Sequence, residues 1–189
     1  MTIKMTTMKG TTMRRPLLAL LTTPLLLASL SACTSLLPQQ PAAPAIYDLG
    51  PGGMPISAPV RSADVIAPDW LDSNGMLYRL GDPQRIQRFT EARWASTPAQ
   101  LLTERLRQRL VLQNTGKALN VGLESFEQRF SSATQSEVVV CVRVSFGERQ
   151  QVFEVKRAGG ADAASGARGL AAATDALIEQ MLAWVASIQ

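Results

Sequence analysis

Residues 138 to 146 read Val-Val-Val-Cys-Val-Arg-Val-Ser-Phe, and this stretch decides the fold. Every second position, from Val138 to Phe146, carries a valine or a phenylalanine. Successive side chains of a β-strand point to opposite faces of the sheet, so the alternation predicts a central strand with one side in the core. If helices cover only that side, Cys141 lies on the other face, either exposed or beneath a partner. We interpret Cys141 as a small packed side chain rather than a reactive thiol.

The segments around this stretch predict further strands of the same sheet. Gly147-Glu148-Arg149 is a turn signal, after which residues 152–156 return as an antiparallel partner. Upstream, Leu119, Val121 and Leu123 alternate as another strand. Earlier β-like runs occur at residues 46–49, 60–66, 76–80 and, with a weaker pattern, 85–94.

A first helix has a well-marked start at Thr97-Pro98-Ala99-Gln100. The threonine can cap the helix, the proline suits its first position, and the glutamine completes a capping box. Leucines one turn apart then form an apolar face, and the helix is expected to end near residues 114–116. Arg105, Arg107 and Arg109 point away from that face. We interpret them as a solvated helix face, with a partner-binding patch as the alternative.

A second amphipathic helix is indicated by an apolar stripe between Leu170 and Ile188, with spacings of three and four residues. The Gly-, Ala- and Ser-rich stretch at 158–168 is expected to be a flexible connection, and it lacks the Gly-Lys-Ser/Thr ending of a phosphate loop. These elements predict an α/β (α+β) sandwich, with one mixed or antiparallel sheet and two amphipathic helices on one face. We expect a single domain over residues 46–189.

The first 32 residues have the order of an export signal. Basic residues precede an apolar stretch at 17–30, which Thr22-Thr23-Pro24 interrupts, so a signal peptide over 1–32 is favoured over a membrane-spanning helix. Leu30-Ser31-Ala32-Cys33 is similar to the lipobox of bacterial lipoproteins, which predicts cleavage before Cys33 and a lipid on its thiol. An ordinary signal peptide with a stray cysteine is the alternative.

The residues after this cysteine indicate where the protein resides. Thr34 follows Cys33 where an aspartate would be the retention signal, and this resembles outer-membrane sorting. We therefore expect a protein that is lipid-anchored at the outer membrane and faces the periplasm. Residues 33–45 are rich in proline, alanine and glutamine, so they are expected to form a lipidated tether or a disordered leader without a spacer role.

Charge argues against a nucleic-acid partner. Residues 1–32 hold four of the 19 basic residues and none of the 15 acidic ones, so the rest of the chain balances 15 positive against 15 negative charges. The net charge of +4 therefore belongs to the predicted signal peptide, and no basic nucleic-acid-binding surface is expected.

Residue usage also argues against catalysis. The sequence has no histidine, which removes the usual general base and the commonest metal ligand, and no cofactor or metal is expected. A serine–lysine mechanism would need Lys117 or Lys156, and neither lies in a recognisable motif. A carboxylate pair remains open, but exposed loop acids are far commoner than catalytic pairs; the acids concerned are Asp69, Asp72, Asp82 and Glu91. We therefore expect no enzyme.

Short motifs follow the tether in a fixed order. They are Tyr47-Asp48-Leu49-Gly50, then Trp70-Leu71-Asp72 with Met76-Leu77-Tyr78-Arg79, then Arg93-Trp94-Ala95 with Pro98 and Leu101-Leu102. After a lipobox, this combination resembles the ABC-type transport auxiliary lipoproteins, the family of the PqiC-like outer-membrane lipoprotein of the paraquat-inducible Pqi system. The resemblance spans most of the chain after Cys33, and it implies a compact α/β sandwich.

The resemblance also implies a non-catalytic component anchored in the outer membrane. Such a component works with an ABC transporter and a mammalian-cell-entry (MCE) domain protein to move phospholipid or other hydrophobic molecules between membranes. The uncovered sheet face and the sheet edges remain available to the MCE-domain protein, to ABC transporter subunits or to a second copy in a homo-oligomer. Cys141, Arg143 and Arg93 form the candidate partner surface.

Two other functions stay open on the sequence. One is a lipoprotein that assists assembly of an outer-membrane protein or plugs it. The other is a direct lipid carrier, which needs an apolar cavity between the sheet and the helices.

Overall fold

The alternating valines lie in a long strand at the centre of a sheet. In the computed structural model, which describes residues 42–114 and 116–188, they belong to β8 (Ser136–Phe146). β8 pairs antiparallel with β7 (Lys117–Phe130) along one edge and with β9 (Arg149–Ala158) along the other. The predicted turn between β8 and β9 is confirmed, and the central strand is as the alternation predicted.

The register of these three strands collects apolar side chains on one side. Val140 lies opposite Phe126 of β7 and Val155 of β9, and all three side chains are buried. The next inward residue of β8, Val142, lies opposite Phe153. Val142 also lies opposite Leu123 of β7, so both Val140 and Val142 are flanked by apolar neighbours on the two adjacent strands, which is the cross-strand packing that stabilises a sheet.

β7 is much longer than the alternation at Leu119 to Leu123 predicted. A bulge explains the difference, because Leu123 pairs with Val142 whereas Ser125, two residues on, pairs with the neighbouring Cys141. The extra residue, Glu124, breaks the two-residue period, and the strand then continues with Phe126 on the core side. A simple alternation pattern stops at such a point although the strand does not.

The remaining strands flank β7. Among the described residues the main sheet has seven strands in the order β1-β5-β4-β7-β8-β9, and β3 also pairs with β7. β3 and β4 both run parallel to β7, β3 beside its first half and β4 beside its last residues. The bounds are β1 (Ala45–Tyr47), β3 (Val60–Ile66), β4 (Gly75–Leu80) and β5 (Gln87–Trp94), with the short 3-10 helix η2 (Asp69–Leu71) between β3 and β4.

The first helix, α2 (Pro98–Arg109), begins where the sequence predicted. The side chain of Thr97 accepts a hydrogen bond from the backbone N–H of Gln100, and the Gln100 side-chain oxygen accepts one from the backbone N–H of Thr97. The helix ends earlier than predicted. Leu110 turns to extended backbone and pairs in β6 (Leu110–Val111) with β2 (Ile56–Ser57), so strand pairing replaces the expected last turn.

The second helix, α3 (Ala163–Ser187), begins earlier than predicted, within the stretch assigned to a flexible connection. Asp162 caps it through a reciprocal pair of hydrogen bonds with Ser165. Two glycines in its first turns lie close to the sheet, Gly166 against Gln128 and Gly169 against the carbonyl of Ala158. The glycines therefore serve close helix–sheet packing, not flexibility.

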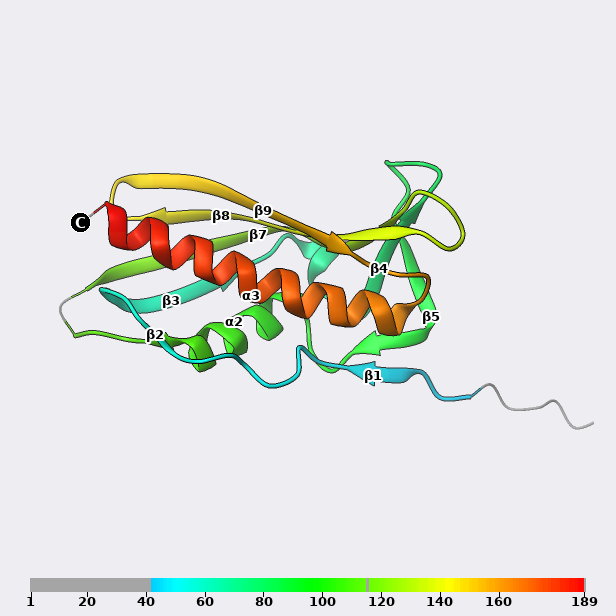
Figure 1. The fold of residues 1–189 in the computed structure, drawn as a ribbon, viewed down its shortest axis with the longest axis horizontal. Coiled ribbons are helices and arrows are strands. Elements are labelled where there is room, and N and C mark those ends of the chain that lie inside the picture. The colour runs from blue at the N-terminus through cyan, green and yellow to red at the C-terminus, as the bar shows by residue number, and fades with distance from the viewer. Residues whose placement is uncertain (1–41, 115, 189) are drawn as a thin grey trace, which may run out of the picture. The chain divides into compact units, whose positions relative to one another are not determined.

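Both helices lie on the same side of the sheet. α3 runs along β8 and β9, and α2 lies beside β3 and touches α3 (Figure 1). Trp94 is buried in the layer between, in edge-to-face contact with Phe126 at 5.4 Å between ring centroids. The predicted α+β sandwich, with a mixed sheet and two helices on one face, is confirmed. Within residues 42–114 and 116–188, no helix combines the length and apolarity needed to cross a membrane.

Candidate functional site

The side of the sheet opposite the helices is an open face. Its side chains come from β3, β7, β8 and β9, and they are half-buried or exposed except at Val139 and Glu127, which lie opposite each other on this side and are fully buried. We define the open face by Ile66, Asn120, Gly122, Glu124, Cys141, Arg143, Ser145, Gln150, Val152, Glu154 and Lys156. This is the surface that the alternation around Cys141 and Arg143 predicted.

One row of the open face crosses four strands. Ile66 pairs with Gly122, Gly122 with Arg143, and Arg143 with Val152. Ile66 is 72% exposed and Val152 44% exposed. Two exposed apolar side chains thus stand on either side of a cationic one, and Gly122 between them adds no side chain. An apolar patch with a central arginine is the composition enriched at the centre of protein interfaces.

Glu124 organises the middle of the open face. Its Oε1 atom accepts hydrogen bonds from Arg143, and both Nε and Nη2 of the arginine lie 2.8 Å away. The Cys141 thiol lies 3.6 Å from Glu124 Oε2 and donates to it. Burial, followed by the nearby Glu124 carboxylate, raises the pKa of the Cys141 thiol to about 11. The thiol is therefore protonated at neutral pH.

Arg93, the third residue of the predicted partner surface, lies elsewhere. It is exposed on β5, which β4 and β7 separate from the strand of Cys141 and Arg143. Cys141 and Arg143 are thus brought together around Glu124, and Arg93 is not part of that group.

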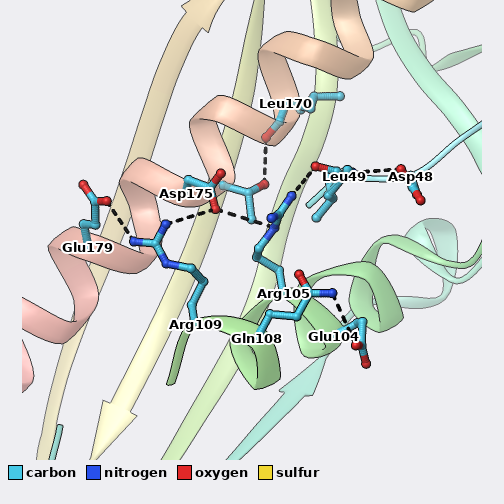
Figure 2. A network of polar contacts seen from close by, with 11 residues as sticks. Asp48, Leu49, Glu104, Arg105, Gln108, Arg109, Leu170, Asp175 and Glu179 are labelled. Atoms are coloured by element: carbon cyan, nitrogen blue, oxygen red, sulfur yellow. Dashed lines mark hydrogen bonds and ion pairs between the residues drawn. The ribbon is translucent and has the colours of Figure 1, made fainter. Parts of the chain in front are cut away.

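Two of the arginines predicted on a solvated helix face are buried, so that interpretation is wrong for them. Arg105 and Arg109 extend from α2 toward Asp175 on α3 (Figure 2). Arg105 Nε lies 3.5 Å and Arg109 Nη1 lies 3.7 Å from the same Asp175 oxygen, so these contacts are ion pairs rather than close hydrogen bonds. Arg109 Nη2 also donates a 2.9 Å hydrogen bond to Glu179. Arg107 is exposed, as predicted.

The loop after β1 closes over these arginines. Arg105 Nη2 donates a hydrogen bond to the carbonyl of Leu49, and Gly53 lies so close to Arg109 that a Cβ atom would collide with its guanidinium. Leucine spacing could not reveal this burial. The available signal was the pair of acids four residues apart on the second helix, Asp175 and Glu179, which needed cationic partners once that helix packed.

The residues considered for catalysis have ordinary structural surroundings. Lys156 pairs with Glu154 at 3.2 Å, and the ammonium of Lys117 lies 5.9 Å from the centroid of the Phe146 ring. In the part of the chain that the structure describes, no group of three His, Cys, Asp or Glu side chains is placed to hold a metal ion. The predicted signal peptide, Cys33 and most of the tether lie outside the described residues.

The raised pKa of the Cys141 thiol is expected to slow its reaction with alkylating reagents. At pH 8 a thiol with a pKa near 11 has roughly 100-fold less thiolate than one at the ordinary value of 9.0, so alkylation at this residue should be slow there, and its rate should keep rising with pH to half of its maximum near pH 11. Glu124→Gln should shift that rise to lower pH. The measurement is the iodoacetamide reaction rate against pH, followed on the Cys141 peptide by mass spectrometry. A midpoint at or below pH 9 in the wild type would contradict the assignment.

Loss of Asp175 is expected to destabilise the contact between the helices. Asp175→Ala leaves Arg105 and Arg109 without their shared acid in a buried place, which should lower the free energy of unfolding by roughly 2 to 3 kcal/mol. Glu179→Ala is the control, since that side chain is 60% exposed and its loss should change stability by less than about 1 kcal/mol. Urea denaturation compares the two variants, and equal losses would argue against the shared-acid role.

Comparisons with known proteins support the fold. No family model matches the chain, and no curated protein matches its sequence. Protein XCC0632 from Xanthomonas campestris, assigned to family DUF330, is 16% identical; the match covers 74% of this chain and 93% of that one, with a TM-score of 0.60. The crystal structure of an uncharacterised protein is also 16% identical, with 76% and 99% covered and a TM-score of 0.59. At this identity the likeness shows the fold alone, a fold shared with a DUF330 protein.

Proposed function

We propose that this protein is a non-catalytic auxiliary lipoprotein of an ABC transporter system that moves lipid between membranes. In this proposal Cys33 anchors the chain in the outer membrane, and the domain faces the periplasm. The open face then binds the MCE-domain subunit of the transporter. The resemblance of the sequence motifs to the ABC-type transport auxiliary lipoproteins supports this function, and the α+β sandwich is the fold which that resemblance implies.

The observation that carries the proposal is the row Ile66, Gly122, Arg143 and Val152 on the open face. A sheet face with no partner normally alternates polar side chains outward, yet this row exposes two aliphatic side chains. Arg143 lies between them in register, with its Nε and Nη2 already oriented by Glu124. A preordered arginine loses less side-chain entropy on binding than a free one, so it is suited to anchor a partner.

The anchor and the open face act together in this proposal. Eight residues lie between Cys33 and Ala42, the first described residue, and the nine steps from one Cα atom to the next, at about 3.4 Å each, reach roughly 30 Å at most. A domain confined this close to the membrane meets an envelope-spanning partner at an effective concentration in roughly the millimolar range. A small binding surface can then suffice for stable association. Loss of that surface and loss of the lipid should each weaken the association.

The test is capture of transporter components from intact cells after cross-linking. Arg143→Glu reverses the central charge of the row, and Gly122→Tyr fills the space beside it. A Cβ at Gly122 meets its nearest neighbour, the carbonyl of Arg143, at an unstrained 3.6 Å, so the fold should be preserved. Both variants are expected to recover at least about tenfold less MCE-domain protein than the wild type. Cys33→Ala should also lose recovery.

Arg107→Glu is the matched control, because Arg107 is also an exposed arginine paired with a glutamate, Glu104 at 3.8 Å, but on α2. It should recover the partner as the wild type does. Recovery of an outer-membrane barrel protein in place of MCE or ABC components would replace the transport proposal with the assembly alternative. Equal recovery by all variants would reject the open face as the binding surface.

A further inference from the structure

A second cluster on the sheet lies outside the open face, where the last residues of β4 and β7 run side by side. Arg79 and Arg129 are direct neighbours across these two strands. Like charges opposite each other in a sheet are unfavourable. Here one fully buried glutamate, Glu127, binds both arginines. Its Oε2 atom accepts a 2.8 Å hydrogen bond from Nε of Arg79, and its Oε1 atom accepts a 2.8 Å hydrogen bond from Nε of Arg129.

Two further carboxylates lie near the pair: Glu137 is directly opposite Arg129 in register across β7 and β8, and Asp82 lines the same pocket as both arginines. A single arginine would already neutralise the buried Glu127 carboxylate, so the tip of the second one is not needed for it. Arg79 Nη1 donates to the carbonyl of Pro83 at 2.6 Å. Among the described residues, no hydrogen bond engages Arg79 Nη2 or either Nη atom of Arg129. Both side chains are fixed through Nε, and donors at their tips remain for a ligand.

Both arginines line an open pocket of about 640 Å³. A carboxylate stands in the same pocket, since Asp82 lines it too, with Oδ1 accepting a 2.8 Å hydrogen bond from the backbone of Gln84. Two guanidinium groups suit the oxygens of a phosphate, and a carboxylate beside them suits an ammonium group. The pocket therefore offers charged partners for a headgroup that carries both a negative phosphate and a positive ammonium group.

A second open pocket of about 340 Å³ adjoins the first, and its lining combines apolar and aromatic side chains with Arg88, Thr90 and Glu91. Leu80 and Phe130 line both, and Leu80 is 45% exposed. The second pocket adds Tyr78 and Phe89, whose rings lie 4.6 Å apart between centroids. The aromatic and apolar side chains of the second pocket offer contacts for the first part of an acyl chain beside the two arginines.

We propose that this end of the sheet binds a zwitterionic phospholipid with a primary amine, such as phosphatidylethanolamine. Its phosphate lies between Arg79 and Arg129, its ammonium pairs with Asp82, and its acyl chain begins along Leu80 and Phe130. This site extends the proposed function. The inference rests on that function, because the lipid would come from the membrane in which the chain is proposed to be anchored. The β4–β5 and β7–β8 loops lie toward the same end of the sheet as the beginning of β1 in Figure 1.

The test is native mass spectrometry of the full chain in non-ionic detergent, titrated with phospholipids of one chain length. Phosphatidylethanolamine should be retained in preference to phosphatidylglycerol and phosphatidylcholine. Arg129→Gln should weaken retention at least about tenfold, because a charge-assisted contact to phosphate is lost. Arg107→Gln is the matched control, since it removes an exposed arginine from another glutamate pair, with Glu104 on α2, and should leave lipid retention unchanged. Circular dichroism checks that each variant is folded.

Asp82→Asn tests the amine contact without disturbing the sheet, since the asparagine oxygen can still accept from Gln84 and the residue is exposed in a loop. It should abolish the preference for phosphatidylethanolamine over phosphatidylglycerol while total retention persists. Three results would overturn the proposal. The wild type could retain all headgroups equally, Arg129→Gln and Arg107→Gln could have equal effects, or inorganic phosphate could bind equally tightly. Gly122→Tyr leaves both pockets intact, so failure of transporter capture and failure of lipid retention are separate results.

Discussion

The described fold depends on the burial of one side of β8. Val138, Val140, Val142 and Val144 have no exposed surface, and this is possible only if β7 and β9 flank them and α3 covers them. Burying a valine side chain is worth about 1.5 to 3 kcal/mol, so this single strand contributes a large share of the core. The same two-residue period places Cys141 and Arg143 on the other side. The open face is thus a direct consequence of how the core is built.

The position of α2 depends on a different interaction. Its leucines bury it against the sheet, but Arg105 and Arg109 fix it on α3 through Asp175 and hold the Leu49 loop over both. Buried ion pairs often add little net stability compared with apolar packing. Their effect here is geometric, since only one placement of α2 brings both guanidinium groups to one carboxylate. Gly53 allows the loop to close over them.

Local signals in the sequence were enough for the central strand, for the capping box at Thr97 and for two helices on one face of a sheet. They failed where distant segments meet. The bulge at Glu124 hides half of β7, the arginines of α2 find their acid about 70 residues away, and Arg79 meets Arg129 only through a parallel pairing of β4 with β7. Strong capping by Asp162 also outweighed the glycines that indicated a loop. Long polar side chains can be exposed or buried on the same helical pattern, so spacing alone does not place them.

The two faces of the sheet therefore differ: the helix side carries the buried core, and the open side is the surface for which we propose a role in recognition. The most direct test compares the same substitution at two valines of adjacent strands. Val142→Ala, on the helix side, is expected to lower the free energy of unfolding in urea by roughly 2 kcal/mol, because its methyl groups leave a cavity. Val152→Ala, on the open face, should change it by less than about 0.5 kcal/mol. Similar losses at both positions would contradict the division, since they would show that the open face also supports the fold.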